Sequence, residues 1–285
     1  MAARPATLWA AIAPVAVGAG IAVGDGVFRW DALGAALTGA LAIQVAANFA
    51  NDASDAERGA DTTERIGPTR AVAAGLLTAR QIWFATAAAM VVAVGAGIYL
   101  TLITNWVIVV IGLASIAATL TYVGGPIPYG YRGLGELFVF VFFGVVATVG
   151  GRFVHDASAP RAAWLLAVPV GLMVTAILVA NNVRDIETDR AVGKRTLAVI
   201  LGRSISQRLF AGLIYGTFIA IAVLAVLDMT PPWTALALLA APLGRPLVQR
   251  LAQHTDGPTL IGVLVGTARL HLLVAIGLAI GAGLG

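Results

Sequence analysis

Long apolar segments, each close to the length that spans a lipid bilayer, recur along almost the whole chain. Its 285 residues are 59% hydrophobic and only 11% charged. In a bilayer every backbone polar group needs an internal partner, so a spanning segment folds as a helix of about 20 apolar residues or as part of a closed barrel. These segments lack the polar stripe of a soluble core helix. We therefore expect an all-α, multi-pass bundle of transmembrane helices.

The pattern predicts nine spans within a single membrane domain that fills residues 1–285. A count of eight or ten stays open, because Pro242 and Pro246 interrupt the eighth span. Arg4 before the first apolar run also fits a signal peptide, but that run is long and no clear cleavage pattern follows it. The expected spans are 7–24, 32–50, 79–101, 105–123, 134–151, 162–182, 207–227, 233–250 and 260–284.

The positive charges are distributed asymmetrically between the two sides of the expected bundle. With the N-terminus inside, 14 of the 18 Lys and Arg residues flank the inner ends of the spans. Short cytoplasmic loops are enriched in these residues. We therefore expect a protein of the cell membrane, with its N-terminus and its acidic motifs on the cytoplasmic side. No basic stripe with interleaved aromatic residues indicates a nucleic-acid partner, and the absence of cysteine excludes thiolate chemistry.

Two acidic clusters that also contain asparagine follow the second and sixth expected spans. Carboxylates in a membrane helix cost about 2.5 to 3.5 kcal/mol each at its centre, so they need a compensating partner. Residues three or four apart share a helix face, which predicts stripes of carboxylate and amide oxygens. Such oxygen ligands suit Mg2+. The candidate ligands are Asp52, Asp55, Asp61, Asp185 and Asp189, with Asn48, Asn51, Asn181 and Asn182 as neighbouring amides.

The two clusters also resemble each other at a constant offset along the chain. Asn51, Asp52 and Asp55 recur as Asn181, Asn182 and Asp185, 130 residues later. This spacing predicts two weak half-repeats, centred on 48–61 and 181–195, each supplying one wall of a diphosphate site. The alternative is that the acids fall at helix ends by chance.

Basic loops follow both clusters. The first contains Arg58 and Arg65, and the second contains Lys194 and Arg195. Cations opposite metal-binding carboxylates would neutralise a leaving diphosphate. The alternative is that they only set the topology of the protein.

Two further features are candidates for substrate contacts. The loop at 121–136 brings Tyr122, Tyr129, Tyr131 and Arg132 to the side of the acidic clusters, where the tyrosines could face an aromatic ring or a developing cation. They could also be ordinary interfacial residues, and we favour Tyr122. Arg269 lies about ten residues into the last span and is therefore expected to face the bundle interior. It would pair there with an acid of the site, with a substrate carboxylate or with a neighbouring helix.

At these motifs the chain resembles the UbiA superfamily of intramembrane prenyltransferases. Within it, the strings at 65–68, 132–136 and 193–197 look most like the branch that prenylates 1,4-dihydroxy-2-naphthoate in menaquinone synthesis. One position departs from the superfamily motif, which places its last aspartate where this chain has Gly59. The resemblance covers nearly the whole chain, but it leaves the oligomeric state open.

The resemblance implies Mg2+-dependent transfer of a polyprenyl chain from its diphosphate to 1,4-dihydroxy-2-naphthoate, with loss of CO2. It implies direct catalytic roles for Asp52, Asp55, Asp185, Asp189, Lys194 and Tyr122. Other acceptors of the superfamily stay open, namely 4-hydroxybenzoate, homogentisate and phosphorylated sugars or glycerol. A transporter is a remote alternative, because transporters tend to bury such acids near the membrane midplane.

Overall fold

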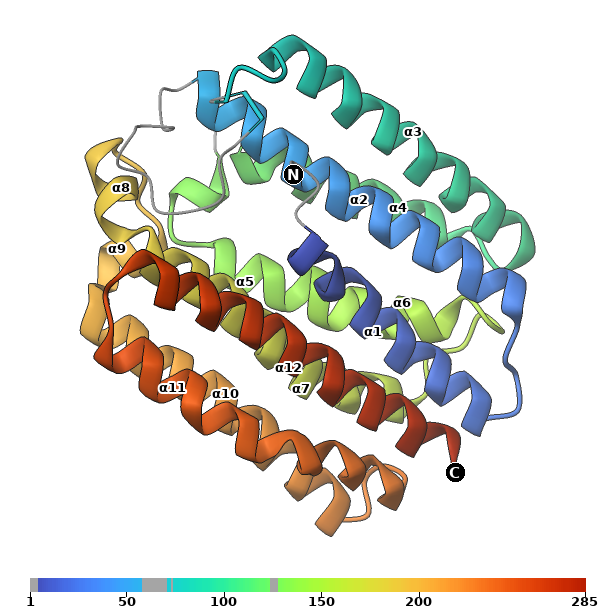
Figure 1. Cartoon of the computed structure of the whole chain (residues 1–285). Helices are drawn as coiled ribbons and strands as arrows, with labels where there is room; N and C mark the ends of the chain where they lie inside the picture. The colour runs from blue at the N-terminus through green and yellow to red at the C-terminus, as the bar shows by residue number, and fades with distance from the viewer. Residues whose placement is uncertain (1–4, 58–70, 73, 124–127) are drawn as a thin grey trace.

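The protein folds as a bundle of long helices that run roughly alongside one another (Figure 1). The computed structural model describes residues 5–57, 71–72, 74–123 and 128–285, and these contain no β-strand. Seven helices are long and apolar enough to cross a membrane, and a shorter apolar helix covers Val107–Tyr122. The expected all-α membrane fold is therefore confirmed.

The helices follow the order of the expected spans. They are α1 (Pro5–Gly24), α2 (Trp30–Glu57), α3 (Ala79–Ile103), α4 (Val107–Val123), η1 (Tyr129–Tyr131), α5 (Gly135–Val139), η2 (Phe140–Val146), α6 (Ala147–Phe153), α7 (Arg161–Arg184), α8 (Ile186–Ala191), α9 (Leu197–Leu201), α10 (Arg203–Val226), η3 (Pro232–Leu243), α11 (Gly244–Gln253) and α12 (Gly257–Gly283). α5, η2 and α6 form one continuous helical span, in which η2 is a π-helical segment.

Two of the expected spans differ from the observed helices. α2 continues to Glu57, so the first acidic cluster lies within its last three turns and not after its end. The expected span at 233–250 is split into the 3-10 helix η3 and the α-helix α11. Pro242 lies within η3, and a proline that lacks a backbone N–H disfavours a regular α-helix there. Together η3 and α11 extend for about 39 Å, enough to cross a membrane.

The long helices of the bundle pack side by side (Figure 1). α2 packs against α3 and α4, and α1 lies between α2 and α12. α7 contacts α1, α10, α12 and the span formed by α5, η2 and α6. The largest buried apolar cluster joins α1, α7, α10 and α12, and it includes Leu166, Met173, Phe210 and Leu270. α7 therefore forms the centre of the core, and its C-terminal end carries the second acidic cluster.

Small residues allow the central helices to approach closely. A Cβ atom at Gly20 would lie 2.3 Å from the carbonyl oxygen of Ala279, and one at Gly277 would lie 2.6 Å from the Cα of Ala237. Only glycine fits at these two positions without moving backbone. Such contacts are typical of membrane helices, where close packing replaces the hydrophobic effect as the force that joins them.

A buried ion-pair cluster closes the end of the bundle opposite the acidic motifs. Arg152, expected in an outer loop, lies in the last turn of α6 and is only 2% exposed. Its Nε donates to Asp25 at 2.7 Å, and its Nη1 donates to Asp156 at 2.6 Å. The guanidinium thus joins the α1–α2 connection to the end of α6. Burial is stable here because each donor has a carboxylate partner.

Candidate active site

A cavity of about 340 Å3 opens between α1, α2, α3, α4, α7 and the span that begins with α5. Its deeper walls are apolar and include Leu100, Ile108, Phe138 and Phe142. At the end near the acidic motifs its lining becomes polar. The polar lining residues there are Asn48, Asn51, Asp55, Tyr122, Asn181, Asn182, Asp185, Thr188, Asp189 and Lys194. Both predicted motifs therefore contribute to one cavity.

The first motif presents one face of α2 to this cavity. Asn48, Asn51 and Asp55 line it at helical spacing, whereas Asp52 is buried at 1% exposure without lining the cavity. Consecutive residues on a helix point about 100° apart. The Nδ2 of Asn48 donates to Thr7 at 3.1 Å, which ties this face of α2 to α1. The role of Asp52 as a ligand stays a prediction, and Asp55 is the carboxylate that reaches the cavity.

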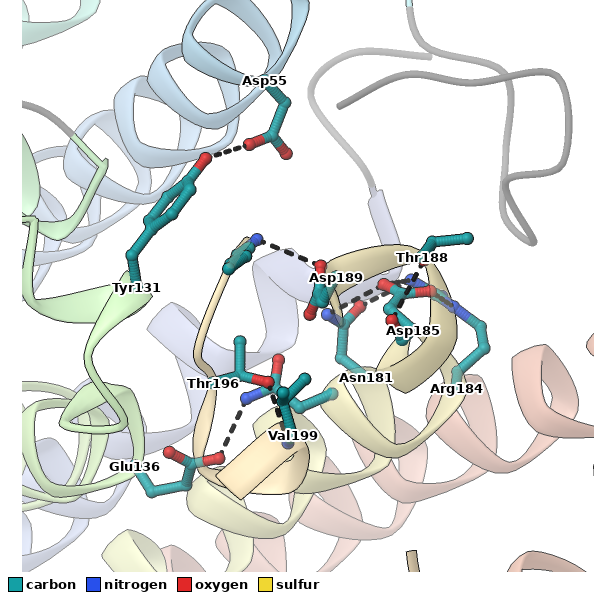
Figure 2. A network of polar contacts seen from close by, with 12 residues as sticks. Asp55, Tyr131, Glu136, Asn181, Arg184, Asp185, Thr188, Asp189, Thr196 and Val199 are labelled. Carbon is teal, nitrogen blue, oxygen red and sulfur yellow. Dashed lines mark hydrogen bonds and ion pairs between the residues drawn. The ribbon is translucent and has the colours of Figure 1, made fainter. Parts of the chain in front are cut away.

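Tyr131 connects the two walls of the polar end. Its hydroxyl donates to Asp55 at 2.6 Å, and Lys194 Nζ lies 4.9 Å from the centroid of its ring (Figure 2). The backbone N–H of Arg195 also donates to the carbonyl of Tyr131 at 3.2 Å. The 3-10 turn that carries Tyr131 therefore touches both motif regions. The sequence left Tyr131 open between a pocket-lining and an interfacial position, and its contact with Asp55 places it beside the site.

The second motif lies where the chain passes from α7 into α8. α7 ends at Arg184, and the backbone N–H of Asp185 still donates to the carbonyl of Asn181 at 3.2 Å. Arg184 donates to both carboxylate oxygens of Asp185, from Nε at 2.7 Å and from Nη2 at 2.5 Å. The same Nη2 donates to Asn181 at 3.0 Å (Figure 2). This buried arginine neutralises Asp185 and fixes its orientation, and the sequence motif alone did not indicate that role.

Asp189 is a buried acid beside a cation and two other carboxylates. It lies on α8, one turn beyond Asp185, and Lys194 Nζ is 3.6 Å from its Oδ1. Burial raises the pKa of Asp189 to about 6, and the negative charges of Asp185 and Asp55 act in the same direction, against Lys194. The polar end thus holds mutually repelling carboxylates from both motifs.

This donor set fits a hard divalent cation. No group of three acids, histidines or cysteines in the described part of the chain is arranged as a complete metal site. Mg2+ needs no such cage, because it keeps several waters and binds through one or two carboxylates together with substrate phosphates. Burial is the main cause of the raised pKa of Asp189, and the added repulsion from Asp185 and Asp55 is an excess of negative charge that a cation would neutralise. Asp55, Asp185 and Asp189 all line the cavity and are the candidates for that role.

The chain matches the sequence profile of the UbiA prenyltransferase family over residues 11–261. It belongs to this family. It is 38% identical over 278 residues to 1,4-dihydroxy-2-naphthoate octaprenyltransferase of Mycobacterium tuberculosis (strain ATCC 25618 / H37Rv), covering 97% of this chain and 94% of that protein. The protein of the same name from Escherichia coli (strain K12) is 34% identical over 286 residues, with 96% and 92% covered.

Solved structures of UbiA homologues share the fold. The apo structure of a homologue from Aeropyrum pernix K1 has a TM-score of 0.70 at 18% identity, with 96% of each chain covered. A homologue from Archaeoglobus fulgidus bound to DMAPP and Mg2+ has a TM-score of 0.63 at 15% identity, with 98% of each chain covered. The arrangement of helices around the cavity is therefore that of UbiA membrane proteins.

Two buried residues of this UbiA chain, Glu136 and Asn182, form a hydrogen-bonded pair that the sequence did not predict. Glu136, at the start of α5, is 7% exposed, and its Oε1 accepts a 2.9 Å hydrogen bond from Nδ2 of Asn182 (Figure 2). Its Oε2 is buried without a hydrogen-bond partner in the described structure. Glu136 thus fixes the amide orientation of Asn182, which lines the cavity. Glu136 ends the string at 132–136 and begins an otherwise apolar span. An isolated acid in such a span needs a buried partner, and this is the signal that could have indicated the pair.

The tyrosines of the loop at 121–136 have different surroundings. Tyr122 lines the cavity, as favoured from the sequence. Tyr129 also lines it, but its hydroxyl donates to the carbonyl of Ala118 at 2.7 Å, and its ring stacks on Phe138. The hydroxyl of Tyr129 is therefore used to hold the loop against α4.

Several expected site residues lie elsewhere. Arg132 and Arg195 are exposed and do not line the cavity, although Arg195 follows Lys194, which does. Arg58, Arg65 and Asp61 lie outside the described residues. The expectation that Arg269 faces the bundle interior is wrong, because Arg269 is exposed on the outer face of α12. The inner face of that helix is occupied by buried Leu264, Ala268 and His271.

Proposed function

We propose that this protein transfers a polyprenyl group from polyprenyl diphosphate to 1,4-dihydroxy-2-naphthoate, releasing diphosphate and CO2 and forming demethylmenaquinol for menaquinone synthesis. The observation that carries this proposal is one cavity in which an acidic, lysine-containing end meets apolar walls. A substrate with a diphosphate at one end of a hydrocarbon chain has the same division of polarity. The relatives named for this reaction cover nearly the whole chain.

The diphosphate would lie at the polar end, with Mg2+ held by Asp55 on one side and by Asp185 and Asp189 on the other. Bound Mg2+ would stabilise negative charge on the departing diphosphate. Lys194 lies beside Asp189 and would add a positive charge to the same group. Arg184 holds Asp185 in place through two hydrogen bonds, so this carboxylate faces the cavity in one orientation.

The chemical step needs no protein nucleophile. The C–O bond to the diphosphate breaks, and the allylic carbon bonds to the ring carbon that carries the naphthoate carboxylate. That carboxylate then leaves as CO2, and its bonding electrons restore the aromatic ring. Tyr122 and Phe142 line the cavity with aromatic faces, which stabilise positive charge on an allylic carbon. The apolar walls exclude water, which would otherwise capture the cation.

The protein would be oriented in the cell membrane with the cavity's polar end toward the cytoplasm. This orientation places most Lys and Arg residues on the inner side, as the positive-inside rule requires. Both substrates would then reach the site from their ordinary locations: the tail from the bilayer and the naphthoate from the cytoplasm.

The decisive experiment is an acceptor assay with the purified full chain in proteoliposomes. Polyprenyl diphosphate and Mg2+ are supplied with 1,4-dihydroxy-2-naphthoate, 4-hydroxybenzoate or homogentisate, and the lipid product and released CO2 are measured. We expect product and CO2 only with the naphthoate, and no turnover with EDTA. Product from another acceptor, with or without CO2 release, would refute the proposed acceptor while leaving prenyl transfer intact.

A pair of variants tests the location of the site. Asp185→Ala removes a carboxylate that lines the cavity, whereas Glu187→Ala removes an exposed one two residues away. We expect Asp185→Ala to abolish Mg2+-dependent turnover while Glu187→Ala retains it, with both proteins folded in detergent. Equal activity of the two variants would contradict the assignment.

A further inference from the structure

The cavity of the proposed active site continues far beyond its polar end. On α2 its lining residues run from Asp55 to Ala36, about 28 Å along the helix axis. The charged residues that the described part of the chain contributes to the lining all belong to the polar end, namely Asp55, Asp185, Asp189 and Lys194. The opposite part, which we call the deep chamber, is lined by Gly97, Leu100, Ile108, Gly112, Gly150 and Val154.

Two hydroxyl side chains of α4 line the cavity between its two ends, and both are used within their own helix. Ser115 Oγ donates to the carbonyl of Ile111 at 2.8 Å, and Thr119 Oγ1 donates to the carbonyl of Ser115 at 2.8 Å. A buried water needs about two to four polar partners, and the deep chamber offers it no side chain of that kind. Its walls therefore suit a hydrocarbon.

The deep chamber has a closed floor. Five residues of the cavity lining belong to one buried apolar cluster there, namely Val15, Ala36, Leu100, Ile108 and Val154. The carbonyl of Val154 accepts a 2.9 Å hydrogen bond from Oγ1 of Thr104, the residue that follows α3. The floor is thus tied to α3 and to the end of α6, so the cavity has a fixed length.

Three glycines leave room in the walls of the deep chamber. Gly97 on α3, Gly112 on α4 and Gly150 on α6 line it, and a Cβ atom at any of them would meet no neighbouring helix within 4 Å in the described structure. The next residue, Gly151, differs, because a Cβ atom there would lie 3.1 Å from the Cα of Val15 on α1. A larger side chain at Gly97, Gly112 or Gly150 would therefore occupy the chamber and leave the helix contacts in place.

The position of Gly97 can be expressed as a length of prenyl chain. A Cβ atom at Gly39 would lie 3.5 Å from the Cβ of Ala96, so Gly97 is near the level of Gly39 on α2. Gly39 precedes Asp55 by 16 residues, or about 24 Å of helix. An isoprene unit has four chain bonds and extends by about 4.7 Å, since three bonds of an extended backbone span about 3.5 Å. Allowing about 5 Å for metal and diphosphate, about four units reach Gly97.

We propose that the deep chamber receives the distal isoprene units of the donor, and that the open positions at Gly97, Gly112 and Gly150 determine how long a prenyl chain the enzyme accepts. This inference rests on the proposed prenyl transfer. Donors of two or three units end before Gly97 and do not depend on it. Longer donors need the space beside it, because their remaining units fill the chamber toward the floor at Leu100 and Val154.

The test compares Gly97→Leu with Gly95→Leu in the purified full chain. Both glycines are on α3, and a Cβ atom at either would meet no neighbouring helix within 4 Å, but Gly95 is exposed and does not line the cavity. We measure kcat/KM for geranyl diphosphate, with two units, and hexaprenyl diphosphate, with six. Gly97→Leu should lose on the order of thirtyfold with the longer donor and stay within about twofold with the shorter one. Gly95→Leu should match wild type with both.

Two kinetic results would overturn the proposal. An equal loss with both donors in Gly97→Leu would indicate general damage, and an unchanged kcat/KM for hexaprenyl diphosphate would show that the tail leaves the bundle before it reaches the chamber. A wild type that prenylates no acceptor would instead refute the proposed function. In that case, or should Gly97→Leu fail to fold, hexaprenyl diphosphate with a photoreactive group on its last unit is crosslinked to wild type with Mg2+. Adducts on helices that line the deep chamber support the proposal, and adducts confined to other helices or to detergent contradict it.

Discussion

Replacement of Lys194 by methionine is expected to damage prenyl transfer more than any other change of a single cation in the described site. Lys194 Nζ lies 3.6 Å from Asp189 and over the ring of Tyr131, which itself donates to Asp55. Methionine keeps much of the side-chain volume and removes only the charge. The change therefore leaves Asp189 without its cationic partner and deprives the diphosphate of a positive charge.

The structure sets the size of this effect. Two unit charges 3.6 Å apart attract by about 4 to 5 kcal/mol at an effective dielectric constant of about 20. The side chains of Lys194 and Asp189 are 15% and 12% exposed, so desolvation offsets part of that attraction. We expect a net loss of about 2.7 kcal/mol in transition-state stabilisation, which corresponds to about a 100-fold fall in kcat/KM.

The assay measures kcat/KM for polyprenyl diphosphate at saturating acceptor and Mg2+. Lys194→Arg keeps the charge and should stay within about tenfold of wild type. Arg190→Gln is the matched control, because Arg190 is in the same segment but is 55% exposed and pairs with exposed Glu187. Exposed pairs contribute little, so this variant should resemble wild type.

A double-mutant cycle separates the two roles of Lys194. If it acts only by neutralising Asp189, Asp189→Asn should remove most of the penalty of Lys194→Met. If it also contacts the diphosphate, part of the penalty should persist in the Asp189→Asn background, which is the outcome we expect. A kcat/KM of Lys194→Met within threefold of wild type would refute the reasoning.

Three further predictions concern the ends of the bundle. Glu136→Leu removes the oxygen that accepts from Asn182 and should release that amide from its fixed orientation, raising the KM for the acceptor more than it lowers kcat; unchanged kinetics would contradict the positioning role. Arg152→Gln should cost about 2 to 3 kcal/mol of stability, because it leaves Asp25 and Asp156 unpaired, and a thermal unfolding midpoint in detergent equal to wild type would exclude this. Hydrogen bonds from Arg152 lower the pKa of Asp156 from 3.8 to about 2. The stabilisation that ionised Asp156 gives the folded protein should therefore be complete above about pH 4 and be lost as the pH falls toward 2. In acid unfolding, Arg152→Gln should not show this loss of stability between about pH 4 and 2.

The apolar pattern of the sequence was sufficient to predict the helices. A segment inside a bilayer must satisfy its own backbone, so hydropathy and length predict where α1, α3, α7 and α12 lie. The split of the eighth span into η3 and α11 was harder to predict from the sequence. Pro242 marked an irregularity, but the stretch of 3-10 helix that it accompanies depends on packing against α12.

The acidic motifs likewise predicted the polar end of the cavity but not the arrangement within it. Helical spacing grouped Asn51 with Asp55, and both line the cavity. It could not tell that Asp52 would be turned away, because the face that a helix presents is decided by its neighbours. Nor could it pair Asp55 with Tyr131, which is 76 residues away in sequence.

What the sequence alone determined is therefore the membrane fold, the two motifs and their chemical character, because these follow from residue type and local spacing. Only the tertiary structure decided which side chains meet. It paired Asp189 with Lys194, fixed Asn182 on Glu136 and turned Arg269 outward. The physical reason is that hydropathy and helical spacing describe one helix at a time, whereas the face that a helix turns toward the core is decided by the helices packed around it.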